Sequence, residues 1–160
     1  MAAVLFYHLS ESSVEQTVRT LLGRALGQGW KVVVRGGDPT RLDQLDRALW
    51  LGAEDDFLPH GRAGGPHDAD QPVLLTERQV MQAGAAGLML LDGAEFNAEE
   101  AASLERVWVL FEDTDHAVRD VARAQWKLIA ETGIAAQYWI EDGGRWQKKM
   151  ERAAAATGQE

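Results

Sequence analysis

The stretch Trp30-Lys31-Val32-Val33-Val34-Arg35-Gly36-Gly37-Asp38-Pro39 joins a strand pattern to a helix start. Residues 30–35 are rich in Val, which favours a buried strand. Asp38 is a good N-cap residue, and Pro39 then stands at the first helical position, where the backbone N–H has no partner within the helix. The stretch therefore predicts a strand, a tight turn and a helix in direct succession.

Similar units lie on both sides of this stretch. Further strand patterns cover residues 4–9, 73–76, 87–91, 107–111 and 134–140. Helix patterns cover residues 14–27, 39–50, 97–104 and 115–131, with a short helix expected within 77–86. This alternation predicts an α/β fold with a mostly parallel sheet and helices on both faces, which is Rossmann-like but lacks a nucleotide-binding motif.

The chain is expected to form one domain over residues 1–142, followed by a polar, Ala-rich C-terminal tail at 143–160 that extends a helix or frays. Residues 52–71 have no regular period and predict a long, ordered loop. Residues 134–140 are expected to form the last strand of the sheet.

The composition excludes several classes of protein. The chain has 160 residues, a formal net charge of −9 and no Cys, so a disulfide, a thiolate nucleophile and a Cys-ligated metal are ruled out. The N-terminus lacks the basic residues of a signal peptide, and no apolar run approaches the roughly 18 residues of a membrane span. We expect a cytoplasmic protein without direct DNA binding, because DNA binding needs clustered cations.

No cofactor or metal site is predicted. Gly36-Gly37-Asp38 lies where a phosphate loop would lie, but neither common Gly-rich motif is present and Asp38 would repel a phosphate. His60, His67 and Asp68 match no zinc-ligand spacing. A tight turn with a helix cap, and surface histidines, are the simpler interpretations.

Carboxylates follow two of the predicted strands. Asp92 comes after one, and Glu112 and Asp113 come after another. One hypothesis is a nucleotide-binding α/β enzyme that uses these groups. However, no nucleophile or bound metal is evident beside them, and solvated loop charges explain them more simply. No catalytic residue is therefore predicted.

A cationic stripe lies on the predicted helix at 115–131. Arg119, Arg123 and Lys127 are four residues apart, which keeps them on one helical face, and Trp126 flanks the same face. A focused cationic and aromatic patch on an acidic protein suits a short acidic partner. The alternative is a solvated face with ordinary ion pairs, since acidic residues lie four positions from Arg119 and from Lys127 but not from Arg123.

A second cluster is apolar. It comprises Trp50, Phe57, Leu58 and Pro59, at the end of one predicted helix and the start of the long loop. Such a cluster is either part of the core or an anchor for a protein partner.

Motifs spread over almost the whole chain resemble a known family. They are Phe6-Tyr7-His8-Leu9, then Arg41-Leu42-Asp43-Gln44-Leu45-Asp46-Arg47-Ala48-Leu49-Trp50, Phe57-Leu58-Pro59-His60-Gly61 and Ala122-Arg123-Ala124-Gln125-Trp126-Lys127. In this combination the chain resembles the chi subunit of bacterial DNA polymerase III, an accessory of the clamp-loader assembly.

The resemblance implies a non-catalytic replication subunit that binds the acidic C-terminal tail of single-stranded DNA-binding protein. Arg123, Lys127 and Arg119 would pair with carboxylates, and Trp126, where the family often has Tyr, would line the pocket for the terminal side chain. The resemblance also implies a partner-subunit interface at the apolar cluster just described. That partner is either the psi subunit or another replication or repair protein.

Overall fold

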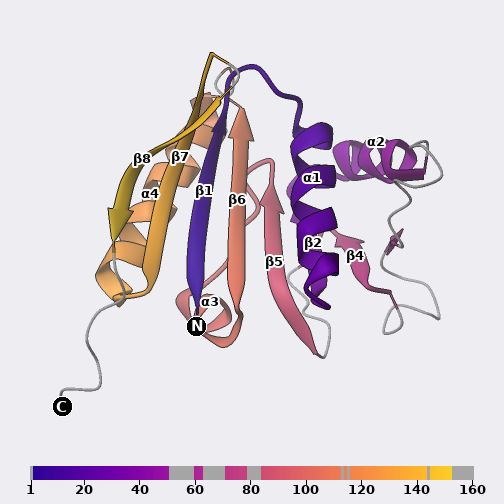
Figure 1. Ribbon diagram of the computed structural model, residues 1–160, viewed down its shortest axis with the longest axis horizontal. Helices are drawn as coiled ribbons and strands as arrows, with labels where there is room; N and C mark the ends of the chain where they lie inside the picture. The colour runs from indigo at the N-terminus through magenta and orange to yellow at the C-terminus, as the bar shows by residue number, and fades with distance from the viewer. Residues whose placement is uncertain are drawn as a thin grey trace.

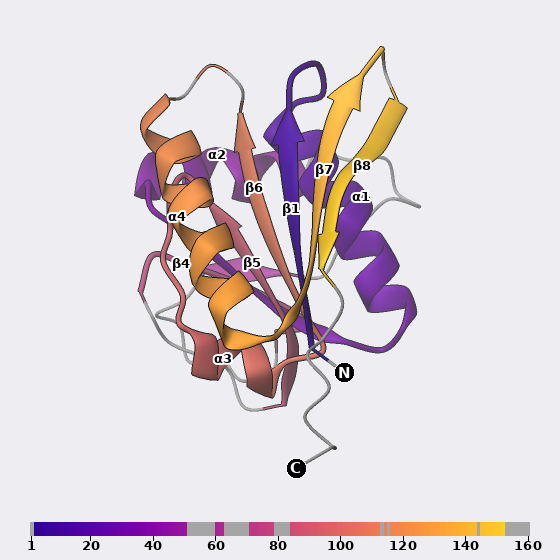
Figure 2. The same ribbon diagram turned by 90° about the vertical axis from the view of Figure 1, so that its left-hand side faces the viewer.

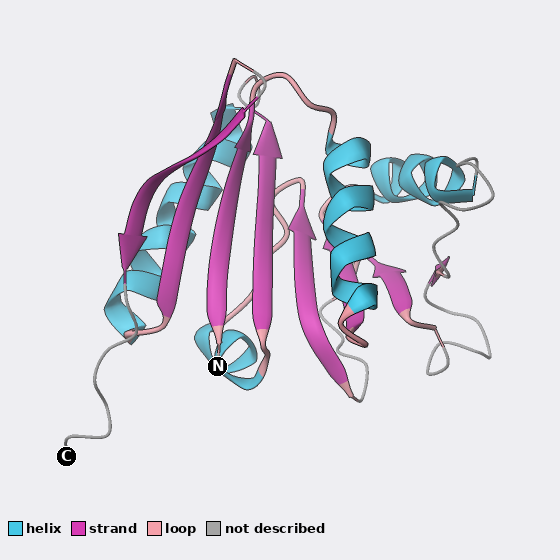
Figure 3. Cartoon of the chain, viewed as in Figure 1, coloured by secondary structure: helices cyan, strands magenta, loops and turns pink. Residues whose placement is uncertain are grey.

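A computed structural model describes residues 2–50, 60–62, 71–78, 84–112, 114, 116–143 and 145–152, except for the Trp50 side chain. The strands are β1 (Ala3–Leu9), β2 (Lys31–Gly36), β3 (Gly61–Arg62), β4 (Val73–Thr76), β5 (Ala85–Leu91), β6 (Arg106–Glu112), β7 (Ala135–Asp142) and β8 (Arg145–Arg152). The helices are α1 (Val14–Gly27), α2 (Pro39–Trp50), α3 (Ala98–Ser103) and α4 (His116–Thr132). Figure 3 distinguishes the helices from the strands by colour.

The described strands form one sheet in the order β3-β4-β2-β5-β6-β1-β7-β8 (Figure 1). Neighbouring strands are parallel throughout, except that β8 runs antiparallel to β7. The predicted α/β class and the mostly parallel sheet are therefore confirmed. The antiparallel edge follows from a short turn at Gly143, whose φ of 60° suits Gly.

Two pairs of helices cover the two faces of the sheet (Figure 2). α1 and α2 pack on one face, where their leucines and valines meet the alternate side chains of the strands. α3 and α4 pack on the other face, around Phe6, Val109 and Ile129. The strands near the middle are covered on both sides, which explains their continuous apolar sequences.

Local capping residues set the starts of three helices, and the cap at Asp38 was predicted above. The Ser13 side chain accepts a hydrogen bond from the Gln16 N–H at the start of α1. Asn97 caps α3 in a capping box with Glu100. Asp38 accepts a hydrogen bond from the Thr40 N–H at 3.0 Å, at the start of α2. Each cap satisfies an N–H group that the helix itself leaves without a partner.

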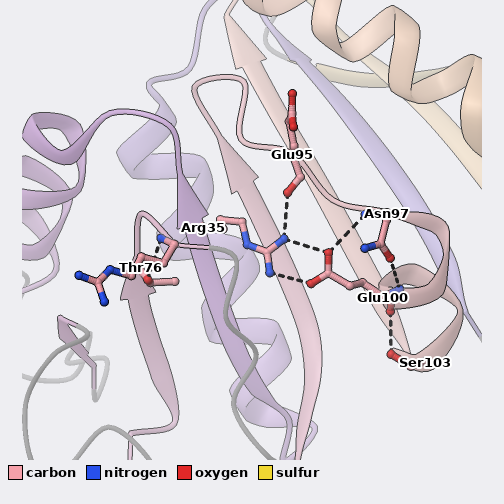
Figure 4. Close-up of polar contacts among 7 residues, drawn as sticks. Arg35, Thr76, Glu95, Asn97, Glu100 and Ser103 are labelled. Carbon is pink, nitrogen blue, oxygen red and sulfur yellow. Dashed lines mark hydrogen bonds and ion pairs between the residues drawn. The ribbon is translucent and has the colours of Figure 1, made fainter.

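A buried ion pair joins β2 to α3 (Figure 4). The Arg35 side chain is 1% exposed, and its Nη2 lies 2.7 Å from Glu100 Oε2. Its Nη1 donates to the Glu95 carbonyl oxygen at 2.9 Å and to Glu100 Oε1 at 3.1 Å. The hydrogen bonds from Arg35 hold the pKa of Glu100 below its usual value, against the opposing effect of burial. Several donors and acceptors thus compensate a charge inside the fold.

Four expectations about elements were wrong. Residues 145–152 form β8, not a helical extension or a frayed tail, because pairing with β7 stabilises an extended conformation that polar residues tolerate at a sheet edge. β7 is therefore not the last strand. The expected loop at 52–71 includes β3, which pairs in parallel with β4. Ala85 and Ala86 belong to β5 instead of a helix, after Gly84 with a φ of 80°.

None of the described helices is long and apolar enough to cross a membrane.

Candidate functional site

A hollow between α4 and the β7–β8 hairpin brings together most of the cationic stripe. It has a volume of about 280 Å³. Arg123, Trp126 and Lys127 from α4 line one side, and Tyr138 from β7 with Lys149 and Met150 from β8 line the other. We call this space the α4–β8 hollow. Its walls combine aromatic rings and a Met side chain with three cations.

The packing of α4 fixes the direction of these side chains. Ala122, Gln125 and Ile129 face the sheet and are buried. The Gln125 amide also donates a hydrogen bond to the Ala94 carbonyl oxygen at 3.1 Å, which holds the helix against the loop after β5. Arg123 and Lys127 follow on the exposed side of the same helix. They therefore stand at the rim of the hollow instead of inside it.

Aromatic contacts hold the Trp126 ring in place. The ring meets Phe6 edge-on, with 5.4 Å between ring centroids, and it meets Tyr138 edge-on at 5.9 Å. Phe6 is fully buried in the sheet. Edge-to-face arrangements of this kind stabilise ring pairs beyond the area they bury. Trp126 is thus a half-buried, fixed wall that offers one part of its surface to the hollow.

The charges around the α4–β8 hollow are weakly compensated. Arg123 lies 4.0 Å from Asp120, and both side chains are exposed, at 64% and 79%. Such a pair contributes little to stability and leaves the guanidinium available to another partner. The ion pairs found among the described residues involve neither Lys127 nor Lys149. The ion pair between Lys127 and Glu131 that the solvated-face alternative would bring is not among those formed by the described residues.

Arg119 lies apart from this group. It is one turn closer to the start of α4, and it is not among the residues that line the hollow. Its Nη1 lies 3.4 Å from His116 Nδ1. A role for Arg119 in peptide binding therefore stays a prediction, and the geometry gives the stronger support to Arg123, Trp126 and Lys127.

The hairpin supplies three lining residues that the sequence did not identify: Tyr138, Lys149 and Met150. β8 was not predicted because the residues after Asp142 are mostly polar and show no strand pattern. A signal was nevertheless present, since only two residues separate Gly143-Gly144 from the predicted strand at 134–140, and a Gly pair between two strands is typical of a hairpin turn.

The position of Lys149 depends on an irregularity in the hairpin. Tyr138 pairs with Met150, but the next residue, Trp139, pairs with Lys148. Lys149 is the extra residue of a β-bulge, a feature that redirects side chains at sheet edges. Consequently, Lys149 and Met150 both line the α4–β8 hollow, whereas Lys148 pairs with Glu151 at 2.9 Å.

The strand-end carboxylates meet around Arg41. The Arg41 Nη2 lies 2.8 Å from Glu112 Oε1, its Nε lies 3.6 Å from Asp92 Oδ2, and its Nη1 lies 3.5 Å from Glu15 Oε1. Burial opposes the charge, but the hydrogen bond with Glu112 and the charges of all three carboxylates raise the pKa of Arg41. Asp92 and Glu112 therefore neutralise a cation from α2. Asp113 lies outside the described residues.

The loops that follow β2 and β5 are in close contact at the carboxyl ends of these strands. A Cβ atom on Gly37 would lie only 2.4 Å from the Asp92 carbonyl oxygen. In nucleotide-binding folds of this class, ligands occupy the crevice beyond the carboxyl ends of the strands, at the point where the strand order reverses. Here Gly37 and the loop after β5 touch at this point.

The loop between β1 and α1 already holds an anion from the chain itself. The Glu141 carboxylate accepts hydrogen bonds from the backbone N–H groups of Ser10, Glu11 and Ser12, at 2.9–3.1 Å. It also accepts one from the Ser12 hydroxyl. Burial alone would raise the pKa of Glu141, but these donors lower it below its usual value. The loop just before α1, a common phosphate position, thus already binds a carboxylate.

A larger cavity, of about 350 Å³, lies on the opposite face of the sheet between α1 and the hairpin. Tyr7, Trp139 and Trp146 provide its aromatic wall, and α1 contributes polar side chains and Arg24. Burial raises the pKa of Tyr7, against the lowering effect of Arg106 and Arg24. Arg24 is the cation on this cavity's lining, compared with three cations around the α4–β8 hollow. It is the less suitable site for an acidic ligand.

The predicted partner-subunit interface is not covered by the described residues. Phe57, Leu58 and Pro59 lie outside them, as does the side chain of Trp50, so this interface stays a prediction. His60, considered above as a metal ligand, is buried, and its Nε2 lies 3.0 Å from Asp46 Oδ1. His67 and Asp68 also lie outside the described residues. In the part of the chain that is described, no cluster of three potential metal ligands occurs.

Comparison with known proteins agrees with the motifs. The family model described as "DNA polymerase III chi subunit, HolC" matches residues 1–137. A curated relative from Rickettsia prowazekii (strain Madrid E), named "Probable DNA polymerase III subunit chi", is 25% identical over 85 residues, which are 53% of this chain and 52% of the relative. That alignment spans about half the length of the relative. Because the family model covers most of the chain, the protein belongs to the DNA polymerase III chi subunit family.

Proposed function

We propose that this protein is a non-catalytic accessory subunit that captures the acidic C-terminal tail of single-stranded DNA-binding protein. Through this contact it would link the polymerase complex to coated single-stranded DNA in the cytoplasm. The observation that carries the proposal is the α4–β8 hollow, in which three cations surround two aromatic rings and a Met side chain. A peptide that ends in an apolar residue with a free carboxylate has the complementary chemistry.

The α4–β8 hollow has apolar walls and a cationic rim, and this arrangement suggests how such a tail would bind. The apolar terminal side chain would contact Trp126, Tyr138 and Met150, where burial of apolar surface favours binding. Carboxylates would pair with Arg123 and Lys127 at the rim, through charge-assisted hydrogen bonds. Many tails on one coated strand would raise the local concentration, so that a modest affinity for each tail suffices.

The alternative of a nucleotide-binding enzyme has less support. The Glu141 carboxylate occupies the N–H groups of the loop before α1, and Arg41 pairs with the carboxylates at the strand ends. A nucleotide phosphate would have to displace Glu141, whose charge already has four donors. The apolar cluster of Trp50, Phe57, Leu58 and Pro59 remains our proposed contact for a psi subunit or another replication or repair protein.

Calorimetric titration with a peptide that copies the host tail tests the proposal. We expect salt-sensitive binding, and we expect Arg123→Ala and Lys127→Ala each to weaken it by roughly three- to tenfold, since they remove one rim charge each. Arg24→Ala is the matched control, because Arg24 is a cation on the opposite cavity. It should change the affinity by less than about twofold. A lack of binding by the unmodified protein would contradict the proposed function.

A further inference from the structure

A second, smaller hollow adjoins the α4–β8 hollow. It has a volume of about 250 Å³ and is lined by His8, Ser10, Ile140, Glu141 and Lys149. Lys149 lines both hollows. They also meet where the Tyr138 hydroxyl approaches His8 Nδ1, at 3.4 Å. A ligand in the first hollow can therefore continue past Lys149 into the second without leaving the surface.

We propose that the second hollow is a subsite for the acidic residues that precede the terminal residue of the bound peptide, and that Lys149 pairs with one of their carboxylates. This inference rests on the proposed function. It adds a contact from β8, which lies beyond residues 1–137 matched by the family model. Lys149 would thus be a specificity residue of this chain, supplied by a β-bulge.

The charges of the second hollow are consistent with this ligand. Its other charged residue is Glu141, whose carboxylate is engaged by Ser10, Glu11 and Ser12 and is almost fully buried. Lys149 is exposed and takes part in no ion pair found among the described residues. A carboxylate that reaches this region therefore meets a cation that does not have to give up another partner.

Two peptides of equal length separate this contact from the rest of the site. One is Asp-rich and ends in Phe with a free carboxylate. The other has every Asp replaced by Asn and keeps the same ending. Lys149→Ala should weaken binding of the Asp peptide by roughly three- to fivefold, the size expected for one partly exposed charge pair, and should change binding of the Asn peptide by less than about twofold.

Lys148→Ala is the matched control, because it removes the same charge from the adjacent residue, which pairs with Glu151 instead of lining either hollow. It should leave both affinities within about twofold. Circular dichroism and thermal melting of the full chain would verify that each variant folds.

The inference is overturned if Lys148→Ala and Lys149→Ala weaken the Asp peptide equally, since that result reflects net charge alone. It is also overturned if Lys149→Ala weakens both peptides equally, because Lys149 would then act only as a wall of the first hollow. Failure of the proposed function is a different result, in which the unmodified protein binds neither peptide.

Discussion

Glu141 connects two parts of the chain that are far apart in sequence. Its carboxylate lies at the end of β7 and accepts hydrogen bonds from the loop that precedes α1, from residues 129 to 131 positions away. The contact fixes that loop and the end of β7, next to the proposed second subsite. A single side chain thereby supports both the fold and the surface beside it.

The variant Glu141→Gln should be less stable at neutral pH. The amide oxygen of Gln can take the place of Oε1, but its N–H₂ group then stands at the Oε2 position, against the Ser12 N–H, and the remaining hydrogen bonds are no longer charge-assisted. We expect the free energy of unfolding to fall by about 1.5–3 kcal/mol. Urea denaturation measures this change, with Asp142→Asn as the control, because Asp142 is exposed. Equal stability of the two variants would contradict the role assigned to Glu141.

The same contact predicts a pH dependence. The pKa of Glu141 in the folded protein is below its usual value of about 4.3. Its contribution is therefore fully present above about pH 4.3 and is lost as the pH falls through the lower, folded-state pKa. The difference in stability between the unmodified protein and Glu141→Gln should narrow over this acid range. Denaturation curves at several pH values would check it, and a constant difference would argue against it.

At the scale of single elements, two glycines should respond to substitution in opposite directions. A Cβ on Gly23, in the middle of α1, would have no neighbour within 4 Å, so Gly23→Ala should raise stability by about 0.5–1 kcal/mol. A Cβ on Gly37 would lie 2.4 Å from the Asp92 carbonyl oxygen, so Gly37→Ala should lower stability by about 1–3 kcal/mol.

Thermal or urea denaturation of both variants tests the packing of the loops at the strand ends. A Gly37→Ala protein as stable as the unmodified one would mean that these loops are not in close contact. The strand-end crevice would then have more room than the structure shows.

Elements with a strong local signal could be predicted from the sequence, and the others could not. Asp38 caps α2 as expected, and Ser13 and Asn97 cap α1 and α3 through the same local chemistry, because capping involves neighbours only a few residues away. β8 has polar residues on most positions, so its strand conformation depends on β7 instead of its own sequence. The hairpin half of the α4–β8 hollow was missed for the same reason.

Ion pairs between residues that are far apart in the sequence could not be predicted either. Arg35 and Glu100 are 65 positions apart, and the sequence suggested no charged partner for Arg35 at the end of a Val-rich strand. The helical half of the site, in contrast, follows from a spacing of four residues and was predicted from that spacing.

For the molecule as a whole, the net negative charge should disfavour binding to polyanions such as DNA. With a formal net charge of −9, the protein repels polyanions, and only a small group of cations, Arg123, Lys127 and Lys149, lines the α4–β8 hollow. We expect no measurable binding to bare single-stranded DNA at moderate salt. Fluorescence anisotropy with a labelled oligonucleotide tests this, with the acidic tail peptide as the positive control. Tight, salt-dependent binding to the oligonucleotide would contradict this prediction and support direct DNA binding.

The Glu141 carboxylate in the loop before α1 has a consequence for how the protein can be regulated. Proteins that use a nucleotide as a switch change state when its phosphate arrives or leaves. In this protein the anion at that position is Glu141, which is covalently part of the chain and cannot be exchanged or hydrolysed. This loop therefore does not work as a nucleotide-dependent switch. On the proposed function, nucleotide exchange at this loop would therefore not regulate the contact with the tails.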